Sequence, residues 1–280
     1  INKMEKIIIN TNEAKPEFDY SKMLNDSFVD VSAKLLQPPI AVSIGTHEYS
    51  GESVANAFGT YGNFSCIVGQ SKARKSFFKS LVVASYIGGN STNFAPDFKT
   101  HRGTDKYVLD FDTEQSEYHS QRVFKRVCDI AGANWKYYKP FSLRKYSHKE
   151  RLQFIEWCLL ESDFKDNIGF VSVDGLADLV SDVNDLSQCN DLVQKLLTWT
   201  DVSKCHLTGI LHTNFGTDKA TGHLGSAVMK KAETVCILEY AKESTTVKFK
   251  YTRGFPIDDF EFKIGLDGLP YTQELQGGNY

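Results

Sequence analysis

The stretch that decides the fold of this chain is Gly69-Gln-Ser-Lys-Ala-Arg-Lys-Ser76. It follows an apolar run typical of a buried strand, residues 63–68, and precedes an apolar run with helical character, residues 77–84. A strand, a glycine-bearing loop, a Lys-Ser pair and a helix in this order predict a phosphate-binding loop. Backbone N–H groups and the helix N-terminus of such a loop face an anion. The alternative is a Lys/Ser-rich helix start after a buried strand.

The residues of this loop have individual expected roles. Lys75 would reach the β- and γ-phosphates of a nucleotide, and the Ser76 hydroxyl would bind Mg²⁺. Arg74 departs from the usual pattern, in which glycine precedes the lysine. We expect a side chain to be tolerated there only if φ of Arg74 is negative. The residues expected to hold the phosphates are Gly69, Gln70, Ser71, Lys72, Ala73, Arg74, Lys75 and Ser76.

Composition and length set limits on the kind of protein. The 280 residues suffice for one large α/β domain or two small ones. Because the net charge is −3, contact with nucleic acid would need a local basic patch. No apolar run approaches the roughly 20 residues of a membrane span, and the first residues do not resemble a secretory signal, so we expect no membrane partner. The six cysteines have no metal-binding spacing, which favours buried, reduced thiols in a cytoplasmic protein.

Strand and helix patterns alternate from residue 40 onward. Strands are predicted at 40–44, 64–68, 107–111, 137–141, 168–173 and 207–211, and helices at 76–87, 116–131, 147–160 and 190–199. The last predicted strands, 234–239, 246–251 and 260–264, have no long helices between them. We therefore predict an α/β fold with a largely parallel central sheet and antiparallel C-terminal strands. The predicted parts are an arm over 1–39 with a helix at 20–36, a main domain over 40–265 and a tail over 266–280.

Polar residues follow three predicted strands at their carboxyl ends, where ligands bind in open α/β sheets. Asp174 fits the carboxylate that supports Mg²⁺ beside a phosphate loop, although it could instead belong to a turn. Glu114 is the candidate to polarise an attacking water. The alternative is that Asp112 and Glu114 cap the helix near Ser116, and both roles can coexist. His212 is a candidate sensor of the γ-phosphate, or else a hydrogen-bonded residue with no further role.

A Gly- and Thr-rich stretch, residues 214–226, is predicted to be a mobile loop. Its basic residues are Lys219 and His223, which makes it the candidate contact for nucleic acid. A plain surface loop is the alternative.

In this chain order, the loop 69–76, Asp112-Thr-Glu114, Asp174 and His212 resemble the RecA-like ATPase core. A glutamate after the second core strand separates that group from AAA+ and most other phosphate-loop enzymes. Within the group the chain is similar to the RepA/DnaB-like replicative helicases. It is also similar to the helicase-like ATPases of mobile elements and phages, often labelled AAA family ATPases. The resemblance covers about residues 40–265 and includes Gly222-His-Leu-Gly-Ser226 and Lys230-Lys231-Ala-Glu-Thr234.

The resemblance implies a RecA-like P-loop NTPase that uses ATP and Mg²⁺. It also implies a homo-oligomeric ring or filament, often a hexamer, with ATP between subunits. A basic residue of the neighbouring subunit would complete the site as an arginine finger, and Arg253 and Lys231 fall where the group carries such residues. The alternative for both is a solvated surface cation. Family loops in the position of 214–223 grip single-stranded DNA through its phosphates, and a primase or an initiator would be a candidate further partner.

These observations give one leading hypothesis and two alternatives. The leading one is an ATP-hydrolysing, helicase-like motor that acts on single-stranded DNA in replication or mobilisation of a phage or mobile element. The first alternative is a RecA-like recombination or annealing ATPase. The second is an ATP-dependent switch protein that does not bind DNA, which the near-neutral charge and the sparse basic loop favour.

Overall fold

A computed structural model describes residues 18–34, 36–214 and 220–272. The chain divides into two compact units, Ile1–Gln37 and Pro38–Tyr280. In the first unit, helix α1 (Tyr20–Ser27) begins at Asp19, whose carboxylate accepts a hydrogen bond from the backbone N–H of Lys22 at 2.9 Å. The prediction of a helix over 20–36 is wrong beyond Ser27. The side chain of Asp30 binds the N–H and hydroxyl of Ser32, and such local bonds compete with a continuing helix.

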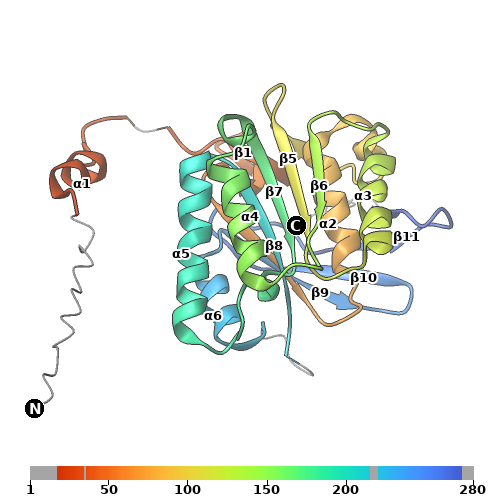
Figure 1. Ribbon diagram of the computed structural model, residues 1–280. Coiled ribbons are helices and arrows are strands. Elements are labelled where there is room, and N and C mark those ends of the chain that lie inside the picture. The colour runs from red at the N-terminus through yellow and green to blue at the C-terminus, as the bar shows by residue number, and fades with distance from the viewer. Residues whose placement is uncertain (1–17, 35, 215–219, 273–280) are drawn as a thin grey trace, which may run out of the picture. The chain divides into compact units, whose positions relative to one another are not determined.

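The second unit is built on a nine-stranded sheet in the order β12-β11-β10-β9-β3-β8-β7-β5-β6 (Figure 1). Its six parallel strands are β3 (Phe64–Gly69), β5 (Tyr107–Asp112), β6 (Tyr138–Ser142), β7 (Ile168–Asp174), β8 (His206–His212) and β9 (Thr234–Tyr240). The strands that follow are antiparallel: β10 (Ser244–Thr252), β11 (Phe260–Ile264) and β12 (Pro270–Thr272). The predicted α/β class, with a mostly parallel sheet and antiparallel C-terminal strands, is confirmed. The strand β12 lies in the part of the chain predicted to be a tail.

Helices cover both faces of this sheet (Figure 1). One layer contains α2 (Lys75–Ile87) and α3 (Glu117–Ala131), and the other contains α4 (His148–Leu160), α5 (Leu186–Ser203) and α6 (Gly222–Lys231). Short 3₁₀ helices lie at η1 (Gly89–Asn93), η2 (Lys165–Asn167) and η3 (Leu176–Leu179). Each layer has its own apolar core, around Phe78 on one face and Trp199 on the other. Both faces of β3 and β7 are therefore buried, which explains their continuous apolar sequences.

The sequence predicted most starts and ends of these elements to within two residues. The capping box at Ser147 and Glu150 is present and begins α4 as expected. Helix α5 is longer than the predicted 190–199, because Asp185 caps it by accepting a hydrogen bond from the N–H of Gln188 at 3.0 Å. Helix α6 shows that the prediction of a loop over 214–226 is wrong from Gly222 onward, and residues 215–219 of that stretch lie outside the described residues. Leu224 and Val228, four residues apart, are fully buried in the core and hold this helix against the sheet.

A second, smaller sheet was mostly missed by the sequence analysis. It has the order β2-β1-β4 and consists of β1 (Ile40–Tyr49), β2 (Glu52–Thr60) and β4 (Phe98–Thr100). Only residues 40–44 were predicted as strand. Ser50 and Gly51 both have positive φ, at 54° and 82°, which is the backbone of a tight hairpin turn. The Ser50-Gly51 dipeptide was the available signal for this hairpin.

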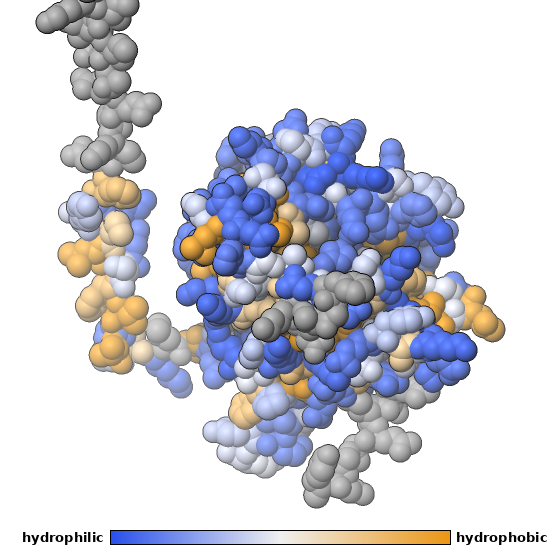
Figure 2. Space-filling model, turned by 90° about the horizontal axis from the view of Figure 1, so that it is seen from below, coloured by the Kyte–Doolittle hydropathy of each residue, from blue (hydrophilic) through white to orange (hydrophobic). Residues whose placement is uncertain are grey.

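The carboxyl ends of the parallel strands point downward in Figure 1, and Figure 2 views the Pro38–Tyr280 unit from that side. The described surface there is mostly hydrophilic, with small separate hydrophobic areas. Among the described residues, no helix is both long enough and apolar enough to span a bilayer. Loops at the carboxyl ends of parallel strands carry the ligand sites of such folds, so a ligand site is expected at this edge of the sheet.

Candidate active site

The predicted phosphate loop connects the end of β3 to the start of α2, as expected. Gly69 lies against β9, since a Cβ there would be 3.1 Å from the carbonyl oxygen of Leu238. Arg74 has φ +61°, so the expectation of a negative φ at this position is wrong. Its guanidinium lies over the ring of Tyr240, with 4.8 Å from Cζ to the ring centroid. This stacking offsets part of the cost of a left-handed backbone, which is about 1–3 kcal/mol.

Lys75 is nearly buried, with 7% exposed, and its ammonium points back onto its own loop. Nζ donates hydrogen bonds to the carbonyl oxygens of Gly69, at 3.0 Å, and Gln70, at 2.7 Å. It also lies 3.2 Å from Nδ1 of His212 at the end of β8. Burial lowers the pKa of Lys75, and the negative charges of Asp174 and Glu114 oppose that effect. The ammonium of Lys75 is therefore held at the carboxyl ends of the strands by two carbonyl oxygens, and phosphate oxygens could replace them as acceptors.

Ser76 and Asp174 form the oxygen pair expected from the sequence. The Ser76 hydroxyl donates a hydrogen bond to Oδ2 of Asp174 at 2.8 Å. Burial raises the pKa of Asp174, and the positive charge of Lys79 counteracts the shift. Two oxygen donors beside a phosphate loop suit Mg²⁺, which commonly uses one or two protein ligands together with substrate phosphates and water. Within residues 18–34, 36–214 and 220–272, no group of three or more His, Cys, Asp or Glu side chains that could hold a metal ion is found.

The sequence analysis missed Lys79, one turn after Lys75 on the buried side of α2. Its side chain is fully buried, 2.9 Å from Asp110 and 4.0 Å from Asp174. Burial lowers the pKa of Lys79, but the two carboxylates outweigh burial, so the pKa is raised overall. A lysine within an apolar helical sequence is stable when buried only if an anion lies next to it. The position of Lys79 in such a sequence was therefore the available signal for its ion pair with Asp110.

The side chains of Glu114, which follows β5, and His212, which ends β8, face each other. Oε2 of Glu114 lies 3.5 Å from Nε2 of His212, whose Nδ1 faces Lys75. An ammonium can only donate, so Nδ1 accepts and the ring proton of a neutral His212 is on Nε2, directed at Glu114. The hydrogen bond with His212 lowers the pKa of Glu114 against the effect of burial. Lys75, His212 and Glu114 therefore form one continuous polar chain.

The loop that carries Glu114 is held by its neighbours. Oδ1 of Asp112 accepts hydrogen bonds from the N–H groups of Glu114, at 3.0 Å, and Gln115, at 2.9 Å. Asp112 thus holds the loop before α3, whose N-cap is Ser116. The Thr113 hydroxyl, which the sequence analysis did not single out, binds the carbonyl oxygen of Asp174 at 2.8 Å. These bonds connect the end of β5 to the end of β7 and so set the position of Glu114 relative to Asp174.

Arg253 and Lys231 do not join this group within one chain. Nη1 of Arg253 donates a hydrogen bond to Oδ1 of Asn63 at 3.0 Å, and Nη2 lies 3.5 Å from the carbonyl oxygen of Lys231. Asn63 precedes β3, whereas Gly69 ends it, and six strand residues span about 20 Å. Both predicted finger residues therefore lie at the opposite end of β3 from the phosphate loop.

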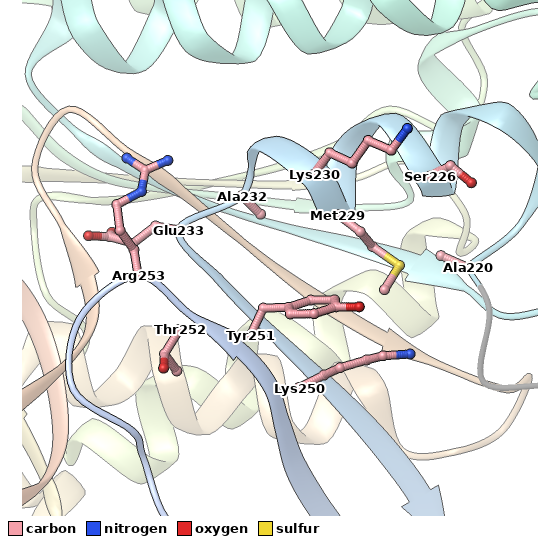
Figure 3. Close-up of a pocket in the computed structure, with 10 residues that line it drawn as sticks. All are labelled: Ala220, Ser226, Met229, Lys230, Ala232, Glu233, Lys250, Tyr251, Thr252 and Arg253. Atoms are coloured by element: carbon pink, nitrogen blue, oxygen red, sulfur yellow. The ribbon is translucent and has the colours of Figure 1, made fainter.

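A hollow of about 690 Å³ extends along α6 and β10 beside Arg253 (Figure 3). Lys230 reaches it from α6, and Lys250 and Tyr251 reach it from β10. Of the two residues predicted to contact nucleic acid, His223 is exposed near the start of α6 rather than in a loop. Lys219 lies outside the described residues.

Five of the predicted residues therefore meet at one edge of the sheet: Lys75, Ser76, Glu114, Asp174 and His212. Together they offer a cation and backbone amides for an anion, an oxygen pair for a divalent ion and a carboxylate for a water molecule. Comparison of this chain with models of protein families finds no match, and comparison with curated proteins finds none either.

Proposed function

We propose that this chain is a RecA-like ATPase that binds and hydrolyses ATP at the loop 69–76. One observation carries the proposal: residues from four separate strand ends meet around that loop. Lys75 follows β3 and lies 3.2 Å from His212 at the end of β8, while Ser76 lies 2.8 Å from Asp174 at the end of β7. Glu114, after β5, lies 3.5 Å from His212. A phosphate loop surrounded by these groups favours nucleotide hydrolysis over nucleotide binding alone.

Different groups of the protein would bind the phosphates and Mg²⁺. Lys75 would exchange the carbonyl oxygens of Gly69 and Gln70 for phosphate oxygens, while the loop amides and the α2 N-terminus bind the rest of the anion. Ser76 and Asp174 are the residues that would hold Mg²⁺, which supplies charge neutralisation at the phosphate oxygens when bound. Lys79 keeps Asp174 in position through the buried ion pair with Asp110.

Glu114 would act on the water. In the hydrolytic step the water oxygen bonds to the γ-phosphorus, the bond from that phosphorus to the β–γ bridging oxygen breaks, and ADP and phosphate are released. Glu114 would accept the proton of the water, a role for which its lowered pKa keeps it ionised. His212 lies between Lys75 and Glu114, so it would couple occupancy of the phosphate site to the position of the base.

The proposal also covers the association of several copies of the chain and the nucleic acid on which they would act. Because Arg253 and Lys231 lie far from the loop of their own chain, they would act on the site of a neighbouring copy in a ring or filament. The motor would act on single-stranded DNA in replication or mobilisation of a phage or mobile element. A second candidate, an ATP-dependent switch that does not bind DNA, is favoured by the net charge of −3.

The test is ATP turnover with and without single-stranded DNA, in the wild type and in Glu114→Gln. We expect the DNA to stimulate turnover. We expect Glu114→Gln to bind ATP but to lose about 10²–10⁴-fold in turnover, because the positioned base is gone. Glu117→Gln, an exposed position in the first turn of α3, is the matched control and should keep full turnover.

Other outcomes would change the conclusion. Normal turnover in Glu114→Gln would remove Glu114 from the mechanism. Turnover that DNA leaves unchanged, with no DNA binding at low salt, would favour the switch protein over the motor.

A further inference from the structure

A second hollow, of about 520 Å³, lies beside the phosphate loop. Its lining comes from the loop residues Gln70–Arg74, from Thr213, and from Ile237–Tyr240 at the end of β9. In the sheet, β9 lies on one side of β3, whereas β8, β7 and β5 lie on the other side. Asp174 ends β7 and Glu114 follows β5, so apart from Thr213, which follows β8, the lining lies on the β3–β9 side. The hollow therefore extends the candidate site away from the groups proposed to carry out hydrolysis.

One wall of the hollow is a stacked pair, Arg74 and Tyr240. The guanidinium Cζ lies 4.8 Å from the centroid of the phenol ring, and Tyr240 keeps 58% of its surface exposed. Nη1 of Arg74 is buried, and in the described part of the chain it has no hydrogen-bond partner. The stack gives the hollow flat surfaces.

The backbone of Arg74 explains why its side chain points into this hollow. Arg74 has φ +61°, and with this backbone its side chain is directed toward the end of β9, where it stacks on Tyr240. Glycine would adopt this backbone at lower cost, but it would leave no group against Tyr240. The strained backbone of Arg74 therefore accompanies the contact between its guanidinium and Tyr240 in the lining of the hollow.

The hollow can accept an uncharged or anionic ring. Its one carboxylate, Glu239, lies 2.7 Å from the ammonium of Lys248 and is thereby compensated. Its volume is within the range of small-molecule pockets, about 300–1,000 Å³. An aromatic base stacks well on a tyrosine ring or on a guanidinium plane. Guanidinium donors also match the ring-nitrogen and carbonyl acceptors of purines.

We propose that this hollow receives the base and ribose of the nucleotide, with the base stacked on the Arg74–Tyr240 pair. The inference rests on the proposed function, because the phosphates of the same nucleotide must occupy the loop. It assigns the substrate class as purine nucleoside triphosphates. A purine offers a larger stacking surface than a pyrimidine.

The test compares two ligands, ATP and inorganic tripolyphosphate, which has the phosphates but neither base nor ribose. Dissociation constants are measured by calorimetry with Mg²⁺ for the wild type, Tyr240→Ala and Arg74→Gly. We expect Tyr240→Ala to weaken ATP about tenfold, as loss of a base–aromatic stack does, and to leave tripolyphosphate unchanged. Arg74→Gly also removes a positive charge beside the phosphate loop, so we expect it to weaken ATP more than it weakens tripolyphosphate. Arg74→Gly suits the positive φ, so it removes the side chain without straining the loop.

Three controls complete the design. Tyr240→Phe keeps the stack and should retain wild-type affinity for ATP. Tyr251→Ala, which removes a half-exposed tyrosine from the other hollow, should change neither affinity. Wild-type protein should bind CTP about tenfold more weakly than ATP if the stack selects purines.

The outcomes separate the two levels of the proposal. Unchanged ATP affinity in Tyr240→Ala and Arg74→Gly, or equal losses for ATP and tripolyphosphate, would overturn the base site and leave the phosphate site standing. Equal affinity for CTP and ATP would overturn the purine assignment. If wild-type protein bound neither ATP nor tripolyphosphate, the proposed function would fail and this inference with it.

Discussion

Lys79 is the residue on which the geometry of the candidate site depends most. It is a fully buried cation between Asp110 and Asp174, and Asp110 also accepts a hydrogen bond from the hydroxyl of Tyr138 at 2.7 Å. Buried ions are stable only when they are paired and hydrogen-bonded. Lys79 therefore holds the Asp174 carboxylate in place for Ser76 and opposes the rise in its pKa that burial causes.

Removal of the Lys79 charge tests this interpretation. We expect Lys79→Met to lower the free energy of unfolding by about 3–5 kcal/mol, because Asp110 and Asp174 would remain buried without a cation. Urea denaturation measures the change. Lys125→Met, at an exposed position of α3, is the control and should change stability by less than about 0.5 kcal/mol. A loss in Lys79→Met as small as that in the control would show that the carboxylates do not need this partner.

At the scale of elements, the site depends on the contact between the ends of β5 and β7. The N–H of Thr113 donates to the carbonyl oxygen of Asp174 at 3.1 Å, and its hydroxyl binds the same oxygen and Oδ2 of Asp178. Gly175, with φ +107°, leaves room for that hydroxyl, since a Cβ at position 175 would be 2.3 Å from it. The two strand ends can approach closely only with a glycine at this point.

Gly175→Ala should therefore separate the two strand ends. We expect ATP turnover to fall by at least about tenfold, because Glu114 and Asp174 move relative to each other, together with a loss of stability of about 1–3 kcal/mol. Turnover assays and thermal unfolding measure the two effects. Gly254→Ala is a suitable control, because a Cβ there meets no atom within 4 Å. Full turnover in Gly175→Ala would contradict the proposed link between these strands.

At the scale of the whole molecule, the sheet separates the phosphate loop from Arg253. Arg253 is anchored to Asn63 at the opposite end of β3, so one chain cannot bring both to the same phosphate. A second copy of the chain can do so only if its Arg253 edge faces the first copy's loop. The proposed oligomer is therefore a requirement of the arginine-finger role.

A mixing experiment tests this arrangement. Arg253→Ala and Lys75→Ala should each lose ATP turnover by about 10³-fold or more, because one lacks the finger and the other lacks the phosphate-binding lysine. A mixture of the two should regain turnover, since some interfaces would combine an intact loop with an intact Arg253. Lys250→Ala, in the same hollow, is the control for a general effect on that surface. Full turnover by Arg253→Ala alone, or no recovery although mass spectrometry detects mixed oligomers, would exclude action between subunits.

The sequence by itself determined the strand–loop–helix arrangement around residues 69–76, the alternation of strands and helices, the capping box at Ser147 and the polar residues at three strand ends. These features depend on local spacing and on apolar periodicity, which can be read along the chain. Three corrections show the limit of such patterns: the arm helix is shorter than predicted, the hairpin was missed, and α6 begins within a stretch predicted to be a loop. Ser50-Gly51 and the buried pair Leu224 and Val228 carried weaker signals.

Only the tertiary structure decided which of these residues meet. The order of the strands places β8 between β3 and β7, which brings His212 against Lys75 and leaves Arg253 at the other end of β3. It also places Tyr240 beneath Arg74. Strand order, the burial of a charge and the stacking of distant side chains arise from contacts between residues far apart in the chain. Local patterns do not encode such contacts, so the arrangement of the site required the fold.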